Sequence, residues 1–331
     1  MAVIESELEE MILNDIIKTC KNLFGFQVFE VVPIKRGWLN LKWKITTSEG
    51  VFLVKQYNKE RFKLYNLEEL LLAFSQQQRL YKQGFPCPRL LSYHDNVMFE
   101  TDNGELFIVM EFCHGEVFPP GNLNTNQMYD LGRFTGLMHR LLNDGTLMKK
   151  KVTNFIPPSR EDRMEYWNSV MVNVRDSLQE HLVPIMERQY QLTKGNSFDE
   201  FGLIEAGWAH RDLWVDNLLF EENRLGAIID FDRLNYDYPQ LDIARAIISC
   251  ALNKNGLKVD TVEAFRKGYS EHISIDARSL IRSLKFLWYL ESTWWIKIDM
   301  DQFTGPPVRF KEEMLWLSEN YNELDAMLGG C

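Results

Sequence analysis

Cysteine is scarce in this sequence and forms no recognisable pattern. The 331 residues contain five cysteines, which are odd in number, far apart in the chain and never spaced as C-x-x-C. Disulfide-stapled domains and structural zinc sites need paired or closely spaced cysteines, so we expect neither. The sequence instead predicts reduced, structural thiols at Cys20, Cys87, Cys113, Cys250 and Cys331.

Long apolar runs are also lacking. No stretch approaches the roughly 20 apolar residues with which a helix crosses a bilayer. The N-terminal segment MAVIESELEEMILNDIIK is acidic and amphipathic, whereas a secretory signal has a basic region followed by an apolar one. We therefore expect a protein that is cytoplasmic when it is made and that has no membrane partner.

The third deficit is in basic residues. Lys and Arg number 37 against 47 Asp and Glu, which gives a formal net charge of −10. Non-specific nucleic-acid binding relies on Lys and Arg that neutralise phosphates, so a nucleic-acid partner is not expected. A local basic pocket for a small anionic ligand stays open, because net charge describes solubility and partners and not the fold.

What is present is an ordinary globular composition, with 45% apolar and 25% charged residues and no internal repeat. A chain of this length exceeds what one hydrophobic core usually organises, so two lobes are expected. In the first 112 residues, helical periodicity and alternation predict a five-stranded antiparallel sheet with an inserted helix. The expected helices are 4–24 and 67–83, and the expected strands are 28–35, 41–47, 51–57, 97–101 and 105–112.

Beyond the Gly- and Pro-rich stretch 113–122, helical patterns dominate. They cover 126–142, much of 160–192 and the region after 241, and strand signals return only in the short pair 217–220 and 225–230. We predict an α+β fold in which a sheet-rich lobe at 1–112 meets a mainly helical lobe at 123–331 through a linker at 113–122.

The sequence WAHRDLWVDNLLF carries the clearest chemical signal. His210, Arg211, Asp212 and Leu213, followed by Asn217, reproduce the catalytic loop H-R-D-L-x-x-x-N of protein kinases. In that loop the aspartate orients the substrate hydroxyl and the asparagine holds a metal. Turn capping would explain either residue alone, since Asp and Asn often stabilise loops. It does not explain their spacing together with a later acid.

That later acid is Asp230, which ends the apolar strand LGAIID. If this strand pairs with NLLF, Asn217 and Asp230 emerge near one end of the same hairpin, and Asp212 lies on the loop before it. Two carboxylates and an amide suit a hard cation such as Mg²⁺, which takes oxygen ligands and shares them with substrate phosphates. Asp232 is ambiguous, either a second carboxylate beside the metal or the first polar residue after the strand.

These motifs resemble the aminoglycoside phosphotransferase and choline kinase group of kinase-like proteins. The group pattern is H-x-D-x-x-x-x-N, then I-D-[FW], then D-x-x-x-D-[LI]-A. The matching segments are 210–217, 229–231 and 237–244. Within the group, the length and aromatic-rich end most resemble the spore-coat CotS-type kinase-like proteins of endospore formers. The resemblance implies a protein-kinase-like bilobal fold, with a nucleotide-binding lobe at 1–112, a hinge at 113–122 and a helical catalytic and substrate lobe at 123–331. It also implies an ATP- and Mg²⁺-dependent phosphotransferase, with spore-coat proteins as further partners.

The resemblance also assigns nucleotide-binding residues in the first lobe. Lys55 shares a strand face with Val51 and Leu53, and as a buried ammonium it needs anionic partners such as the ATP phosphates. Its alternative is a lysine that extends to water. The turn with Gly37 and Asn40 takes the place of a phosphate-binding loop, with an ordinary hairpin turn as alternative. The hinge is represented by Glu111 and Cys113.

The helix glutamate that should pair with Lys55 is missing from its usual position, which falls on Ala73. Glu69 lies four residues earlier on the same helical face and is the predicted partner. Near the catalytic loop, we expect His210 to hold the loop by hydrogen bonds, Arg211 to form a structural ion pair and Asp242 to anchor the loop backbone.

A late helix carries several aromatic residues in the stretch FLWYLESTWWIKID. Such a helix is more often core than a ligand site, although related kinases build acceptor sites from C-terminal helices. Glu291 and Trp295 are therefore the candidate acceptor-binding residues.

The acceptor class follows from a short segment. Only eleven residues separate Asp230 from Asp242, and no A-P-E motif is present. A protein kinase needs a longer activation segment, so a small hydroxyl compound or a saccharide is the expected acceptor. Two alternatives remain: a catalytically weak or inactive kinase-like structural protein of the spore coat, and a metabolic kinase of the homoserine or methylthioribose kinase sort.

Overall fold

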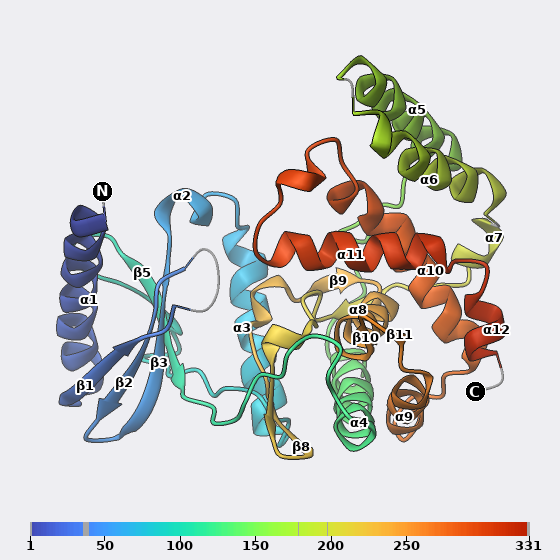
Figure 1. The fold of residues 1–331 in the computed structure, drawn as a ribbon. Coiled ribbons are helices and arrows are strands. Elements are labelled where there is room, and N and C mark those ends of the chain that lie inside the picture. Colours follow the sequence, from blue (N-terminus) through green and yellow to red (C-terminus); the bar gives the residue numbers. More distant parts are fainter. Residues whose placement is uncertain (1, 36–39, 178, 197, 330–331) are drawn as a thin grey trace. The chain divides into compact units, whose positions relative to one another are not determined.

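The chain folds into two units that differ in their secondary structure (Figure 1). The structure is a computed structural model, and it describes residues 2–35, 40–177, 179–196 and 198–329. One unit comprises Met1–Glu116 with Gly226–Arg233, and the other comprises Val117–Leu225 with Leu234–Cys331. The first contains an antiparallel sheet and the second is mainly helical, as the sequence predicts.

The sheet of the first unit has the strand order β1-β2-β3-β5-β4, and neighbouring strands are antiparallel. Both the predicted three-stranded meander and the predicted hairpin are confirmed. The strands are β1 (Val28–Pro33), β2 (Lys42–Thr47), β3 (Gly50–Tyr57), β4 (Met98–Glu100) and β5 (Leu106–Glu111).

A helix covers each face of this sheet. Successive side chains of a strand point to opposite faces, and both faces of this sheet carry apolar side chains that pack against a helix. From α1 (Ala2–Phe24), Ile16 and Cys20 pack against the face that carries Val54. From α3 (Leu67–Lys82), Phe74 packs against the face that carries Tyr57. Lys55 alternates with Val54 and so falls on the α3 face. A single-turn helix, α2 (Lys59–Phe62), connects β3 to α3.

The second unit is built from helices joined by short strands and 3₁₀ turns. The helices are α4 (Thr125–Leu142), α5 (Arg160–Asp176), α6 (Val183–Gly195), α7 (Phe198–Phe201), α8 (Pro239–Ala251), α9 (Val259–Tyr269), α10 (Ala277–Trp295), α11 (Pro306–Glu319) and α12 (Leu324–Leu328). Its 3₁₀ turns are η1 (Glu180–Leu182), η2 (Val215–Asn217) and η4 (Met300–Gln302), whereas η3 (Phe231–Arg233) belongs to the first unit.

The strand content after residue 200 is higher than the sequence predicts. The expected pair forms as β7 (Leu218–Glu221) and β8 (Arg224–Ile228), but it is not alone. A second pair joins β6 (Gly207–Ala209) to β9 (Asn235–Asp237), and a third joins β10 (Leu252–Asn253) to β11 (Gly256–Leu257). The expectation of a single pair was wrong, because strands of two or three residues are too short to show alternation.

Helices α4 and α9 approach each other closely, and glycines make this approach possible. A Cβ atom on Gly132 of α4 would lie 2.0 Å from the carbonyl oxygen of Phe265. A Cβ atom on Gly268 of α9 would lie 2.0 Å from the carbonyl oxygen of Tyr129. Both obstacles are backbone atoms, so a side chain at either position would force the helices apart.

We therefore expect Gly268→Ala to lower the free energy of unfolding by roughly 3 kcal/mol, at the upper end of overpacking effects. Gly195→Ala is the matched control, because Gly195 ends α6 with open space around its Cβ position. It should be neutral or stabilising by up to about 1 kcal/mol. Urea denaturation measures both. A Gly268→Ala protein as stable as the wild type would contradict the close packing of α4 and α9.

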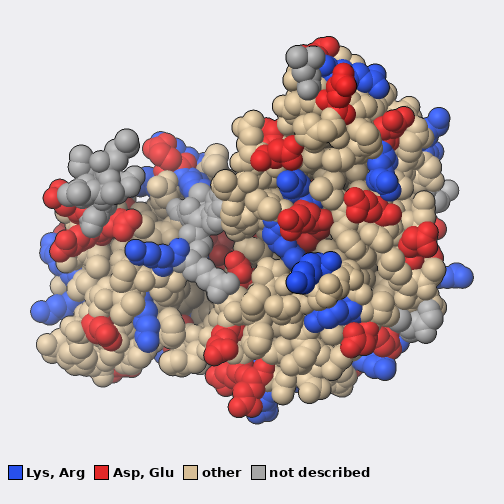
Figure 2. All heavy atoms as spheres, viewed as in Figure 1, with Lys and Arg blue, Asp and Glu red and all other residues tan. Residues whose placement is uncertain are grey.

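On the face shown in Figure 2, acidic and basic side chains are interspersed rather than gathered by sign. In the described part of the chain, no helix combines the length and the apolar character that crossing a membrane requires.

Candidate active site

The loop that carries Asp212 and Asn217 is fixed by buried apolar side chains and by its own hydrogen bonds. Leu213 and Val215 are fully buried, and the N–H of Val215 donates to Ser249 Oγ of α8 at 3.1 Å. The N–H of Asn217 donates to the carbonyl oxygen of Trp214 and closes the turn η2. Buried and partly exposed residues alternate from Asp212 to Asn217, so the buried ones hold the loop in place.

Asp242 anchors the start of the same loop. Its carboxylate accepts the N–H of His210 and the N–H of Arg211, each at 2.7 Å. It also lies 3.0 Å from His139 Nε2, and His139 Nδ1 lies 3.0 Å from the hydroxyl of Tyr269. The carboxylate can only accept, so Nε2 donates to it, and in the neutral imidazole Nδ1 then accepts from the hydroxyl. The predicted anchoring role of Asp242 is confirmed.

The two residues before Asp212 have the structural roles that the sequence predicts. His210 is fully buried, and its Nδ1 accepts the N–H of Asp212 at 3.2 Å. Arg211 forms an ion pair with Asp237, with 2.6 Å between Nε and Oδ2. Its backbone has a φ of 67°, a left-handed conformation that a non-glycine residue rarely adopts and that functional loops often contain.

Protonation of Asp242 should loosen this loop. Burial raises the pKa of its carboxyl group, but hydrogen bonds from His139 and the loop backbone outweigh burial and lower the pKa below the usual value. A lowered folded-state pKa contributes stability above the unfolded-state value of 3.8, and this contribution is lost as the pH falls through the folded-state pKa.

We expect Asp242→Asn to cost about 3 kcal/mol at pH 7, because its amide nitrogen would face N–H donors inside the fold. The difference from wild type should shrink as the pH falls below 4. Asp276→Asn is the control: Asp276 also accepts a backbone N–H, from Ser279, but it is an exposed helix cap where Asn serves equally well. Thermal unfolding across pH measures both, and equal effects of the two substitutions would contradict the anchoring role.

Asp212 and Asn217 are joined directly. The amide nitrogen of Asn217 donates to the carbonyl oxygen of Asp212 at 2.8 Å and to its Oδ2 at 3.1 Å. Because the amide nitrogen is used in this way, the amide oxygen points in another direction. An oriented amide oxygen is a suitable ligand for a hard cation.

In the first unit, Lys55 lies between two carboxylates. Its Nζ is 2.8 Å from Asp230 Oδ1 and 2.6 Å from Asp232 Oδ2. The side chains of Lys55 and Asp232 are 5% and 6% exposed, whereas that of Asp230 is 27% exposed. Asp230 has a φ of 66°, so the backbone turns sharply where β8 has just ended. The alternative interpretation, a lysine that extends to water, is not observed.

These groups influence each other's ionisation. Burial disfavours the ammonium of Lys55, yet Asp230 and Asp232 together raise its pKa above the usual value. Burial also raises the pKa of Asp232, against the lowering effect of Lys55. One ammonium cannot neutralise two carboxylates, so this cluster carries an excess negative charge.

That excess charge fits a bound cation. Among the described residues, no three His, Cys, Asp or Glu side chains gather into a complete metal site. Mg²⁺ usually needs no such group, because it binds one or two carboxylates and takes its other ligands from water and substrate phosphates. The more exposed carboxylate of Asp230 and the oriented amide of Asn217 are ligands of the right chemistry.

The other predicted nucleotide contacts have varied surroundings. Gly37 lies outside the described residues. Asn40 Oδ1 accepts the N–H of Asn58 at 3.2 Å, just after β3. Glu111 pairs with Arg89 at 2.8 Å. Burial raises the pKa of the Cys113 thiol to about 11, and the role of Glu111 and Cys113 in a hinge stays a prediction.

The predicted pairing of Lys55 with Glu69 is not observed. Lys55 pairs with Asp230 and Asp232, and Glu69 lies in the first turn of α3, where its N–H donates to the capping residue Asn66 at 3.3 Å. Asp232, which the sequence left ambiguous, is therefore a partner of Lys55. Two features of the sequence could have indicated this: Asp230 and Asp232 flank the apolar residue Phe231, and the helix position expected to hold a glutamate holds Ala73.

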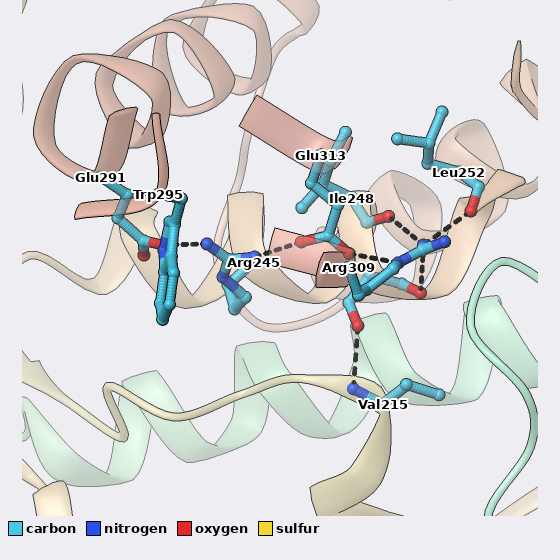
Figure 3. A network of polar contacts seen from close by, with 9 residues as sticks. Val215, Arg245, Ile248, Leu252, Glu291, Trp295, Arg309 and Glu313 are labelled. Atoms are coloured by element: carbon cyan, nitrogen blue, oxygen red, sulfur yellow. Dashed lines mark hydrogen bonds and ion pairs between the residues drawn. The ribbon is translucent and has the colours of Figure 1, made fainter. Parts of the chain in front are cut away.

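The aromatic helix α10 is mostly core, as the sequence favours, with Trp288 and Tyr289 buried. Glu291 belongs to a polar network that also includes Arg245, Glu313 and Arg309 (Figure 3). Arg245 bridges Glu291 and Glu313, and Arg309 binds Glu313 at 2.7 Å. Arg309 also donates to the carbonyl oxygens of Ile248, Ser249 and Leu252 at the end of α8.

Trp295 is linked to this network as well. Its Nε1 donates to Glu291 at 3.2 Å, and its ring lies 4.7 Å from that of Phe310. Phe310 in turn lies 5.1 Å from the ring of Trp214, which stands between Asp212 and Asn217 in the loop. Glu291 and Trp295 therefore have structural partners, and their role in acceptor binding stays a prediction.

The network should contribute to stability through Glu313, which is fully buried between two arginines. We expect Glu313→Gln to cost about 3–5 kcal/mol, because it leaves buried positive charge uncompensated. Glu319→Gln, an exposed change at the end of the same helix, should stay within about 0.5 kcal/mol of wild type. Chemical denaturation measures both. If the two variants unfold alike, the arginines do not depend on Glu313.

Comparison with known proteins agrees with these motifs. Residues 30–280 match the phosphotransferase enzyme family. The homoserine kinase of Zymomonas mobilis is 22% identical over 293 residues, which cover 85% of this chain and 86% of that protein. The homoserine kinase of Bartonella tribocorum is 24% identical over 211 residues, which cover 64% of this chain and 61% of that protein.

Solved structures share the fold at low sequence identity. The amicoumacin kinase hAmiN, in complex with AMP-PNP and Ca²⁺, has a TM-score of 0.61 at 15% identity, over 94% of this chain and 93% of that one. Spectinomycin phosphotransferase APH(9)-Ia, in complex with ADP and spectinomycin, has a TM-score of 0.59 at 15% identity, over 96% and 97%. The fold is therefore kinase-like, and the chain belongs to the phosphotransferase enzyme family.

Proposed function

We propose that this phosphotransferase transfers the γ-phosphoryl group of ATP, with Mg²⁺, to a hydroxyl group of a small molecule or saccharide. The observation that carries the proposal is the joint presence of two constellations: the hydrogen-bonded pair Asp212 and Asn217, and the buried ammonium of Lys55 with Asp230. Phosphoryl transfer depends on positioning and on charge stabilisation more than on covalent chemistry. These residues supply both.

Each residue has a defined task. Asp212 accepts a hydrogen bond from the acceptor hydroxyl and orients its oxygen toward the phosphorus. Lys55 binds the phosphate oxygens of the nucleotide. Asn217 and Asp230 hold the cation, which when bound neutralises negative charge on the transferred group. The backbone near Glu111 and the N–H of Cys113 bind the adenine, while Gly37, Asn40 and Glu69 remain proposed nucleotide contacts.

The acceptor is proposed to be a small hydroxylated compound, and L-homoserine is the first to test. Two homoserine kinases are similar to this chain at 22% and 24% identity, and the short segment between Asp230 and Asp242 disfavours a protein acceptor. Glu291 and Trp295 of α10 remain candidate acceptor contacts. Saccharides form the second group. Amicoumacin and spectinomycin would be screened with them, since two solved neighbours are named as an amicoumacin kinase and a spectinomycin phosphotransferase.

Association with the spore coat remains the second candidate. Its support is the resemblance of the motifs and the aromatic-rich end to CotS-type kinase-like proteins. In that case the chain would be a weak or inactive kinase-like structural protein with coat proteins as partners. Retention of Lys55, Asp212, Asn217 and Asp230 favours an active enzyme.

Nucleotide binding and transfer can be tested in order. Mg·ATP at about 100 times its Kd should stabilise the wild-type protein by roughly 2.7 kcal/mol, measured as a rise in Tm. With an active acceptor, Asp212→Asn should lower kcat by about 10²–10⁴-fold with little change in the KM for ATP, because it removes hydroxyl orientation and leaves the nucleotide contacts intact. A coupled assay of ADP release measures this.

Asp216→Asn is the matched control in the same loop and should keep wild-type kcat. An unchanged Tm at millimolar Mg·ATP would reject the transferase and leave a kinase-shaped structural protein. If ATP binds but Asp212→Asn retains full kcat, the assignment of Asp212 is wrong.

A further inference from the structure

The cluster around Lys55 contains one carboxylate more than metal binding by Asp230 explains. Asp232 makes the shorter of the two contacts with Lys55, at 2.6 Å, and is 6% exposed against 27% for Asp230. A carboxylate so deeply buried needs a permanent partner. Lys55 is the cation within ion-pair distance of it.

The position of Asp232 is fixed by the turn η3, which packs against α3. Phe231, between the two acids, is fully buried and anchors this turn. The residue of α3 at the expected glutamate position is Ala73, which is fully buried and has no group that could reach an ammonium. The carboxylate therefore comes from the turn that packs on the helix and not from the helix itself.

The two acids also differ in what they can reach. Asp230 is partly exposed, so a cation and its phosphate ligands can approach it. Asp232 Oδ2 lies 2.6 Å from the buried ammonium and its side chain is only 6% exposed, so it is much less accessible to a cation than Asp230. Asp232 is therefore the better placed of the two to remain paired with Lys55 if Asp230 binds a cation.

We propose that Asp232 is the positioning residue that holds Lys55 for the nucleotide phosphates, the task that the sequence assigned to a helix glutamate, while Asp230 serves the metal. The proposal rests on the proposed function, because it assigns Lys55 to ATP. Asp232 does not contact ATP or the metal, and it acts through Lys55 alone.

Nucleotide affinity with and without Mg²⁺ separates this role from metal binding. Calorimetric titration with AMP-PNP should show that Asp232→Asn weakens binding by roughly ten-fold, which corresponds to about 1.4 kcal/mol. The factor should be the same in Mg²⁺ and in EDTA, because the lysine contact needs no metal. A loss of AMP-PNP affinity that appears only in the presence of Mg²⁺ would identify Asp232 as a metal ligand and overturn the proposal.

A double-mutant cycle tests whether Asp232 acts through Lys55. In a Lys55→Met background, Asp232→Asn should change affinity by less than about two-fold, since coupled residues are not additive. Full additivity would overturn the proposal. Arg233→Gln, an exposed change in the same turn, is the control and should bind like wild type.

Removing one member of a buried ion pair also destabilises the fold, so each variant is first melted without ligand. Asp232→Glu retains the carboxylate. If Lys55 needs a carboxylate at this position, this variant should bind AMP-PNP with a Kd within about three-fold of wild type. It replaces Asp232→Asn if that variant is unfolded at the assay temperature. If the wild-type protein does not bind AMP-PNP, the proposed function is rejected. If the wild type binds AMP-PNP and the Asp232→Asn variant binds it equally well, only the role of Asp232 is rejected.

Discussion

The buried carboxylate of Asp242 is the constraint on which the loop that carries Asp212 and Asn217 depends. It accepts two consecutive backbone N–H groups, from His210 and Arg211, just before Asp212. Two consecutive amides can point at one carboxylate only if the backbone bends, and Arg211 accordingly has a left-handed φ. The loop geometry is therefore maintained by a charge from α8 together with the loop's own buried side chains and hydrogen bonds.

Asp242 is itself held by the helical core. His139 of α4 binds its carboxylate, and Tyr269 of α9 binds the other nitrogen of His139. That chain of hydrogen bonds requires α4 and α9 to lie close together, which Gly132 and Gly268 permit. Glycines far from Asp212 in the sequence thus contribute to its position, because they set the distance across which His139 and Tyr269 meet.

Much of this fold follows from the sequence because its elements are long or locally defined. Alternation predicts the strands of the first unit, and Asp-Asn-Gly between two apolar runs predicts the hairpin of β4 and β5. The strands β6 and β9 escape prediction, since three residues with a distant partner carry no periodic signal. The spacing of Asp212 and Asn217 predicts the loop, and their hydrogen bond agrees with it.

The partner of Lys55 could not be predicted in the same way. Helical spacing makes Glu69 a reasonable partner of Lys55, but the actual ion pair depends on which carboxylate the packed fold places within contact distance of the ammonium. The packing of Phe231 brings Asp232 to Lys55. Likewise, the position of Glu291 on an aromatic helix suggests an acceptor contact, while its pairing with Arg245 depends on the placement of α8 against α10.

The two buried ionic clusters differ in their charge balance, and this difference bears on their roles. In the second unit, Arg245 and Arg309 face Glu291 and Glu313, so the charges cancel and the cluster is complete. In the first unit, Lys55 faces two carboxylates. A buried cation can also be stabilised by ring faces and neutral oxygens, as Arg163 is by Tyr289 and Thr293.

The two carboxylates beside Lys55 carry one negative charge more than its ammonium neutralises. Either a proton or a further cation must compensate this excess charge. A structural cluster would have been as stable with one carboxylate replaced by an apolar side chain, so the excess charge at Asp230 and Asp232 is better explained by a ligand that brings positive charge. Under the proposed function, the divalent cation that Asp230 would bind supplies that positive charge, whereas the charges of the cluster in the second unit already cancel.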